Sequence, residues 1–156
     1  MMGTEERVAE LGLELPEPLT PVANYVMAKQ ASGLVFLAGH GPLDAAGQLR
    51  TGKLGADLDT AAGVEAARVV GLSILATLRH ELGSLDWVRQ VVKVFGMVNC
   101  TPDFVDIPTV INGCSDLLVE VFGDQGRHAR SAVGMTSLPL GMAVEIEAVV
   151  QVSVVT

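Results

Sequence analysis

Hydrophobic residues recur along this chain with two periods, and the change from one period to the other separates helices from strands. From residue 57 to 82, apolar side chains return every three or four positions and Gly83 follows, which predicts a long helix. Residues 108–122 repeat this pattern between a proline in the first turn and Gly123. A short helix is predicted at residues 4–13, where Thr4 precedes two glutamates in the first turn.

Segments rich in β-branched residues predict strands between these helices. The first two strands form a hairpin around Ser32 and Gly33, and the third carries valines on both faces, as a central strand does. A glycine-rich loop over residues 39–55 and a turn over 138–141 supply connections. The predicted strands are residues 25–31, 34–38, 87–99, 131–135 and 143–154.

This order of elements predicts one α+β domain over residues 1–156, with both main helices on one face of a sheet and the N-terminal helix as an addition. The chain is 49% hydrophobic and only 18% charged, so the other face of the sheet needs a cover that a chain of this length does not supply. Association with further copies of the chain is the expected answer. Composition alone does not choose between a dimer and a trimer.

The charge balance argues against one class of function. The net charge is −8, the pI is about 4.7 and the chain has only three lysines. The basic surface of a general nucleic-acid-binding protein is therefore missing, and nucleic acid is not an expected partner. Arg127, His128 and Arg130 form the only cluster from which a basic pocket could be built.

Neither a metal site nor a membrane segment is predicted. Metal-ligand spacing is missing from the three histidines, His40, His80 and His128. Cys100 and Cys114 are expected to be reduced thiols, with a disulfide between them as the alternative. The N-terminus has no apolar segment of signal length, and the ten residues at 69–78 are too few to span a membrane. These features predict a cytoplasmic protein.

The most informative position is Arg130, a single cation at the start of an uncharged run, residues 131–144. An arginine that enters an apolar strand is costly unless an anion meets it. Either the protein supplies that anion, from Glu145 or Glu147, or a ligand does. The choice decides between a structural ion pair and a binding site for an anionic molecule.

Several sequence blocks resemble one known family in their order and spacing. They are VFLAGHGPLD at 35–44, LDWVRQVVKV at 85–94, ARSAV at 129–133 and VEIEA at 144–148. Over about residues 20–154 the chain is similar to the reactive intermediate deaminase family, RidA or YjgF, whose members were once described as endoribonuclease L-PSP or translation-inhibitor proteins. The last two blocks, with Leu138 and Pro139 between them, resemble the family's C-terminal signature and are the specific part of the match.

The resemblance implies a chorismate-mutase-like fold with a mixed sheet, assembled as a homotrimer with ligand clefts between subunits. It also implies hydrolysis of enamines and imines, such as 2-aminoacrylate and 2-iminobutyrate, to 2-keto acids and ammonia. No cofactor takes part in that reaction. The implied partners are further copies of the chain and a small imine, enamine or keto acid that carries a carboxylate.

The same resemblance assigns three catalytic residues. Arg130 holds the substrate carboxylate, since a guanidinium meets a carboxylate with two parallel hydrogen bonds. Glu145 matches the first glutamate of the family's Glu-x-Glu pair and acts near the attacking water as general base or water holder. Tyr25 aligns with a tyrosine that orients the substrate. From the residues alone, an Arg130–Glu145 ion pair, solvated strand carboxylates and a core position for Tyr25 stay open.

Several positions depart from the family pattern and predict a divergent subgroup. His40 replaces the usual glutamine after Gly39, and Ala132 stands where a cysteine is common. In the family, a polar residue of the second main helix lines the cleft. Counting back from Gly123 places this position at Ser115, whereas residue type favours Asn112. A structural role stays open for His40 and for His128, which precedes the signature block. The predicted binding residues are Arg130, Gly39, His40, Asn112, Ser115 and His128.

Three functions are compatible with these residues. The first is hydrolytic deamination of small 2-imino acids. The second is a non-catalytic trimer that binds a small carboxylate or keto acid as a regulator or scavenger, which needs Arg130 but no group that activates water. The third covers other activities linked to the family or fold, namely RNA cleavage, chaperoning and chorismate chemistry. The acidic charge argues against RNA cleavage, and the small number of cations argues against a dicarboxylate such as chorismate.

Overall fold

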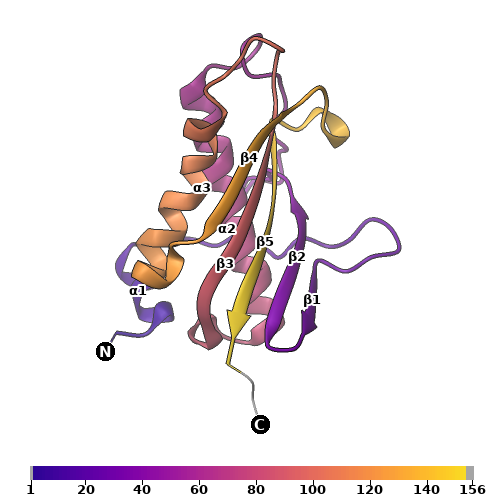
Figure 1. Ribbon diagram of the computed structural model, residues 1–156. Coiled ribbons are helices and arrows are strands. Elements are labelled where there is room, and N and C mark those ends of the chain that lie inside the picture. Colours follow the sequence, from indigo (N-terminus) through magenta and orange to yellow (C-terminus); the bar gives the residue numbers. More distant parts are fainter. Residues whose placement is uncertain (1, 154–156) are drawn as a thin grey trace.

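The computed structural model describes residues 2–153 as a five-stranded sheet with helices packed on one face (Figure 1). The strands follow the order β1-β2-β5-β3-β4, and only β3 and β4 pair in parallel. The predicted mixed sheet and α+β class are therefore confirmed. The strands are β1 (Ala28–Ala31), β2 (Leu34–His40), β3 (Val88–Asn99), β4 (Ala129–Met135) and β5 (Val144–Val152).

The two main helices, α2 (Thr60–Leu82) and α3 (Ile107–Phe122), pack on each other and on the same face of the sheet, as predicted. Helix α2 begins three residues later than its apolar pattern predicted. Asp59 is its N-cap and accepts a hydrogen bond from the amide of Ala62 at 2.8 Å. The amides of residues 56–58 bond instead to the carbonyl of Lys53, so this segment forms a turn.

Helix α2 has the length and apolar composition that a membrane span requires, so the estimate of ten residues from the sequence was too short. Most of this helix is buried between α3 and the sheet. That burial is typical of the central helix of a globular domain, which passes the same test of length and composition.

The other element boundaries differ from the sequence predictions by a few residues. Strand β1 begins at Ala28 because the amide of Tyr25 closes a turn onto the carbonyl of Ala23. Strand β4 begins two residues early, at Ala129, because it already pairs with Lys93 of β3 there. Short 3₁₀ turns, η1 (Leu85–Trp87), η2 (Gly123–Gly126) and η3 (Pro139–Gly141), connect the larger elements.

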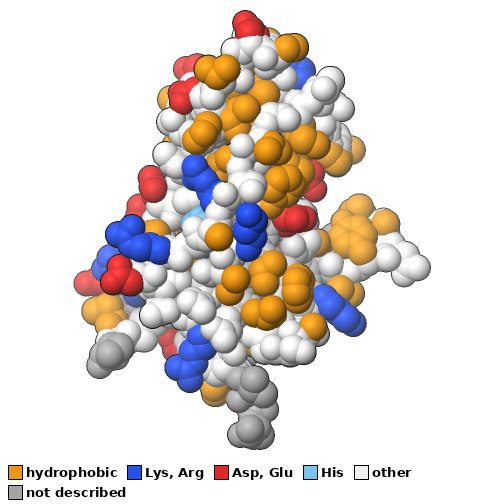
Figure 2. Space-filling view, in the orientation of Figure 1, with side chains coloured by type: hydrophobic (Ala, Val, Ile, Leu, Met, Phe, Trp, Pro, Cys, Tyr) orange, Lys and Arg blue, Asp and Glu red, His pale blue; other side chains and the backbone are white. Residues whose placement is uncertain are grey.

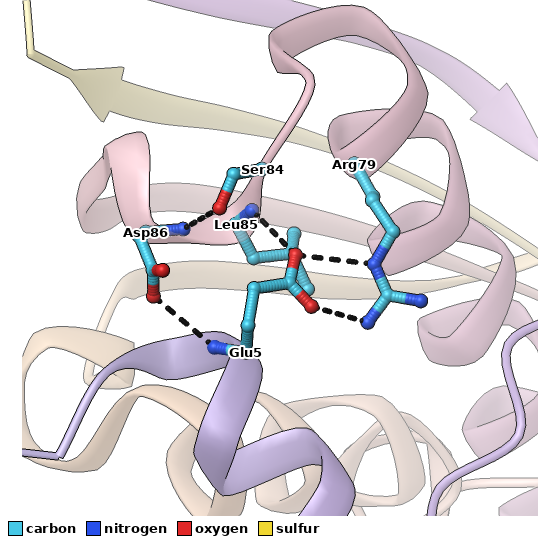
Figure 3. Close-up of polar contacts among 5 residues, drawn as sticks. All are labelled: Glu5, Arg79, Ser84, Leu85 and Asp86. Atoms are coloured by element: carbon cyan, nitrogen blue, oxygen red, sulfur yellow. Dashed lines mark hydrogen bonds and ion pairs between the residues drawn. The ribbon is translucent and has the colours of Figure 1, made fainter.

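The N-terminal helix α1 (Thr4–Glu10) is held to the end of α2 by one carboxylate (Figure 3). Glu5 accepts hydrogen bonds from Nε of Arg79 at 3.1 Å, from Nη2 of Arg79 at 2.6 Å and from the amide of Leu85 at 2.8 Å. The amide of Glu5 donates in turn to Asp86. The helix ends earlier than the predicted residue 13, since Gly12 turns the chain at φ +64°.

This contact predicts that Glu5→Ala lowers the free energy of unfolding by about 1–2 kcal/mol, because three charge-assisted bonds to a carboxylate that is 32% exposed are lost. Chemical denaturation measures the change. Glu10→Ala is the matched control on the same helix, since its ion pair with Arg7 is exposed and its removal should change stability by less than about 0.5 kcal/mol. Equal effects of the two variants would contradict the role of Glu5.

The sheet face opposite the helices carries exposed apolar side chains, which gather over the strands in Figure 2 together with a few charges. Phe36, Val92, Val133 and Met135 are each more than a third exposed. Charged and polar groups lie among them, including Lys93, whose Nζ donates to Ser131 at 3.1 Å. This face is the uncovered surface that the composition predicted.

Candidate functional site

Arg130 lies on the edge strand β4 and reaches toward helix α3. Its Nη1 donates to Oδ1 of Asn112 at 2.8 Å and to Oγ of Ser115 at 3.2 Å, and its Nη2 donates to the carbonyl of Pro108 at 3.3 Å. Asn112 and Ser115 are three residues apart on α3 and therefore share one face of the helix. The two alternatives for the polar position thus both contact the same guanidinium.

All three acceptors of Arg130 are neutral. The described residues form five ion pairs, and none of them includes Arg130. An arginine has five N–H donors, so the Nε donor and one Nη2 donor have no partner within residues 2–153. Two neighbouring donors on one edge of a guanidinium are what the two oxygens of a carboxylate require.

The internal pair between Arg130 and Glu145 that the sequence left open does not form. Val94 of β3 pairs with Arg130 on one side and with Ala148 of β5 on the other. Glu145 lies three residues before Ala148 along β5. Two strand spacings and three residues place their Cα atoms roughly 14 Å apart. The two side chains also leave opposite faces of the sheet, since Arg130 contacts α3 and Glu145 alternates with the buried Val144 and Ile146.

His128 and Ser115 form a second polar contact beside Arg130. Nε2 of His128 lies 2.9 Å from Oγ of Ser115, and Nδ1 lies 2.6 Å from the carbonyl of Gly126. A carbonyl only accepts, so Nδ1 carries the proton and Nε2 presents its lone pair to the serine hydroxyl. Burial lowers the pKa of His128, the hydrogen bond to Gly126 partly opposes this effect, and the nearby Arg130 charge lowers the pKa further, so the neutral imidazole is favoured.

Glu145 lies on the open face of the sheet, against the backbone of Gly39 on β2. A Cβ at position 39 would overlap Oε1 of Glu145, so only glycine leaves room for this carboxylate. Partial burial raises the pKa of Glu145, and the neighbouring charge of Glu147 raises it further. Glu147 extends from the same face and is exposed, as the alternation in sequence predicted.

This packing predicts that Gly39→Ala displaces the Glu145 carboxylate while leaving the fold intact, because the overlap is with the end of a flexible side chain. The activity that depends on Glu145 should fall roughly 10–100-fold, as for other small misplacements of a catalytic group. Gly12→Ala, which strains a surface turn at φ +64° on a different element, controls for a general loss of stability and should keep its activity. Full activity of Gly39→Ala would show that the position of Glu145 is not critical.

The prediction that the His40 side chain binds a ligand is wrong for this subunit. His40 is fully buried, with Nδ1 2.6 Å from the carbonyl of Ala38 and Nε2 2.9 Å from Oγ1 of Thr77 on α2. A β-bulge between Leu37 and His40 adds one residue to β2 and turns His40 toward the helices. Regular alternation with Phe36 would have placed it on the open face.

Tyr25 precedes β1, at the opposite edge of the sheet from β4. Its side chain is 47% exposed, so the alternative of a core aromatic residue is wrong. Four strand spacings of about 4.8 Å separate this edge from Arg130. One subunit therefore does not bring Tyr25, Glu145 and Arg130 together.

Both cysteines are buried and free, as expected from the sequence. Burial raises the pKa of Cys114 to about 12, although the nearby charge of Arg130 opposes this effect. The Cys114 thiol is therefore unreactive at neutral pH. Within residues 2–153, no three His, Cys, Asp or Glu side chains lie close enough together to hold a metal ion.

Two groups near this region were missed by the sequence analysis. The Pro108 carbonyl that accepts from Arg130 is a backbone group, which no side-chain pattern indicates. Nζ of Lys53 donates to Oδ1 of Asn99 at 2.7 Å and to the carbonyl of Thr136 at 2.5 Å, in the wall of a pocket of about 410 Å³. A lone lysine in a glycine-rich loop gave no signal for this long-range contact.

The sheet order, the helices on one face and the arginine directed at α3 from an edge strand define an α+β domain of the chorismate-mutase-like class. A family model described as "YjgF/chorismate mutase-like, putative endoribonuclease" matches residues 5–149. The chain belongs to this family, which confirms the resemblance drawn from the sequence blocks.

Individual relatives place the chain within the family. It is 41% identical to Protein TCP17 of Trypanosoma cruzi over 144 residues, which cover 92% of this chain and 90% of that protein. A protein of unknown function from Agrobacterium tumefaciens, Atu1372, is also 41% identical and superposes with a TM-score of 0.87 over 96% of this chain and 94% of its own. RidA from a Psychrobacter species is 26% identical with a TM-score of 0.60, over 87% and 94% of the two chains. The lower similarity to RidA agrees with the predicted divergent subgroup.

Proposed function

We propose that this protein hydrolyses small 2-imino acids to 2-keto acids and ammonia, with Arg130 as the group that binds the substrate carboxylate. The observation that carries the proposal is the state of Arg130 itself. Its charge meets only neutral acceptors, and two of its donors are left without partners among the described residues. Each charge-assisted bond to a bound carboxylate contributes about 1.5–3 kcal/mol.

In this proposal the site is assembled between subunits of a homotrimer, the assembly that the family resemblance implies. Arg130 and Tyr25 lie at opposite edges of one sheet, and Glu145 lies on the open face. A neighbouring copy that covers the apolar open face would bring a second set of these groups to the Arg130 edge. The two free, buried thiols fit a reducing compartment, so we place the protein in the cytoplasm.

Glu145 is the general base, or the holder, of the attacking water in this proposal. Because its pKa is raised, the carboxylate loses its charge at a higher pH than an ordinary glutamate does. The value of kcat/KM should therefore fall as pH decreases through this raised pKa, and the ionised base is fully available above it. Glu145→Gln should lower kcat about 10²-fold or more at every pH and leave carboxylate binding intact. A pH–rate profile with an unchanged acidic limb in Glu145→Gln would exclude this role.

The test of the function is the release of keto acid and ammonia from freshly generated 2-imino acids. An amino acid oxidase produces them in situ from a panel of amino acids, and an added amine trap competes for the free imine. The protein should increase keto acid and reduce the trapped imine, and the panel identifies the preferred side chain. A folded, oligomeric protein with no effect on any imine would favour the alternative, a non-catalytic trimer that binds a stable carboxylate at Arg130.

A further inference from the structure

The bulge in β2 shapes the part of the subunit that holds the Glu145 carboxylate. Between Leu37 and His40 the pairing of β2 with β5 shifts by one residue. A bulge of this kind leaves an extra residue outside the ladder and changes the direction of the backbone beside it. Here it presents the bare backbone of Gly39 to Glu145, at a point where a Cβ would overlap Oε1 of the carboxylate.

The imidazole of His40 ties this bulge to the helix layer. Its Nδ1 lies 2.6 Å from the carbonyl of Ala38, and its Nε2 lies 2.9 Å from Oγ1 of Thr77 on α2. Because a carbonyl only accepts, Nδ1 carries the proton and Nε2 accepts from the hydroxyl of Thr77. His40 is fully buried and Thr77 is 4% exposed, so both contacts form away from solvent.

The residue before Gly39 is held on two sides. The amide of Ala38 donates to the carbonyl of Met27 at 2.9 Å, and the carbonyl of Ala38 faces the ring of His40. Gly39 follows directly and has the greatest backbone freedom of any residue type. The position of its backbone therefore depends on these neighbouring contacts.

We propose that His40 is a positioning residue for Glu145. Its ring, held between Ala38 and Thr77, fixes the backbone of the bulge in the form that leaves room for the carboxylate. The role rests on the deaminase function proposed above, in which Glu145 serves the attacking water. His40 itself faces α2 and acts only through the bulge. Arg130 lies three strand spacings from β2, so its hold on the substrate carboxylate does not depend on His40.

Two pairs of substitutions test this role. Thr77→Val keeps the shape of the side chain and removes its hydroxyl, whereas Thr77→Ser keeps the hydroxyl. His40→Leu removes both ring contacts, whereas His40→Gln keeps an amide that can donate to Ala38. We expect kcat to fall about 10-fold or more in His40→Leu and roughly 3–10-fold in Thr77→Val, with KM nearly unchanged because Arg130 still binds the carboxylate. Thr77→Ser and His40→Gln should recover most of the wild-type activity.

The pH profile gives a readout that a merely structural role would not change. Partial burial raises the pKa of Glu145, and the charge of Glu147 raises it further. A loosened bulge exposes the carboxylate, so its pKa falls toward the ordinary value and the acidic limb of kcat/KM moves to lower pH. The other charged group that shares this face on β3 is Lys93, β2 contributes none, and the four variants leave these charges in place. NMR titration of the Glu145 carboxyl measures the same shift without turnover.

The experiment measures kcat, KM and the pH profile of the four variants on the imino acid that wild type prefers, with thermal unfolding as the check of folding. Ser73→Ala is the matched control on α2, since it removes a buried hydroxyl that has no hydrogen-bond partner among the described residues. It should keep the wild-type kcat and pH profile. If His40→Leu does not fold, Thr77→Val decides the outcome. An unchanged kcat and acidic limb in Thr77→Val would overturn the positioning role and leave the deaminase function standing. An inactive wild type would overturn both.

Discussion

Replacing Arg130 with alanine is expected to lower kcat/KM for 2-imino acids by roughly 10²–10⁴-fold, because two charge-assisted hydrogen bonds of about 1.5–3 kcal/mol each are lost. Arg130→Lys keeps the charge but lacks the planar fork, so we expect a loss of roughly 10–100-fold. Steady-state kinetics on one imino acid measures both effects. A decrease in kcat/KM in the order Arg, Lys, Ala would show that the geometry of the guanidinium contributes beyond its charge. Equal values for arginine and lysine would indicate recognition by charge alone.

Two controls make this prediction specific. Arg127→Ala removes a neighbouring exposed cation, which pairs with Asp124, and should leave kcat/KM unchanged. An uncharged analogue in which an amide replaces the substrate carboxylate should be a poor substrate for wild type and should show little further loss with Arg130→Ala. A full loss on this analogue would mean that Arg130 supports the fold or the chemistry and does not bind the carboxylate.

The largest expected effect on stability comes from Gly113→Ala. Gly113 faces α2, and a Cβ there would overlap the backbone carbonyl of Val64 and come within 3.1 Å of the amide nitrogen of Arg68. Backbone atoms cannot move aside as a side chain can, so the two helices must separate. We expect a loss of about 2–3 kcal/mol, although alanine favours a helix more than glycine does. For a domain of this length that corresponds to a melting temperature lower by roughly 5–10 °C.

Asp116→Ala tests a substitution to alanine on the exposed side of the same helix and should change stability by less than about 0.5 kcal/mol. Thermal and denaturant unfolding of the two variants give the comparison. Wild-type stability in Gly113→Ala would show that α2 and α3 do not need this close approach.

The sequence predicted the elements well where periodicity is long and uninterrupted. Helices α2 and α3 and strand β3 were located within a few residues, and the parallel pairing of β3 with β4 explains why β4 begins early. Local patterns could not show the bulge in β2, where the backbone of Gly39 leaves room for Glu145 of the neighbouring strand β5. One inserted residue reversed the direction of His40, so a candidate binding group became a core residue.

The sequence named candidate residues for the site but gave no arrangement for them. The signature block singled out Arg130, yet only the fold shows that Asn112, Ser115 and the Pro108 carbonyl share one guanidinium. The contact between Ser115 and His128 joins a helix to the segment before β4, and residues 13 positions apart give no periodic signal. The proposed sharing of the site between subunits came from the family resemblance, and one sheet agrees with it because Tyr25 and Arg130 lie at its opposite edges.

In the proposed site, Arg130 of one subunit and Glu145 of another serve the same substrate. Arg130→Ala and Glu145→Gln, each inactive alone, can be co-expressed with different affinity tags and the mixed oligomers purified. In the proposed trimer, every mixed oligomer has one of its three shared sites with both residues intact, so we predict about a third of wild-type activity. Oligomers of wild type with the doubly substituted chain, mixed in the same way, give the reference for subunit exchange. No activity in the mixed oligomers, with that reference active, would contradict the shared site.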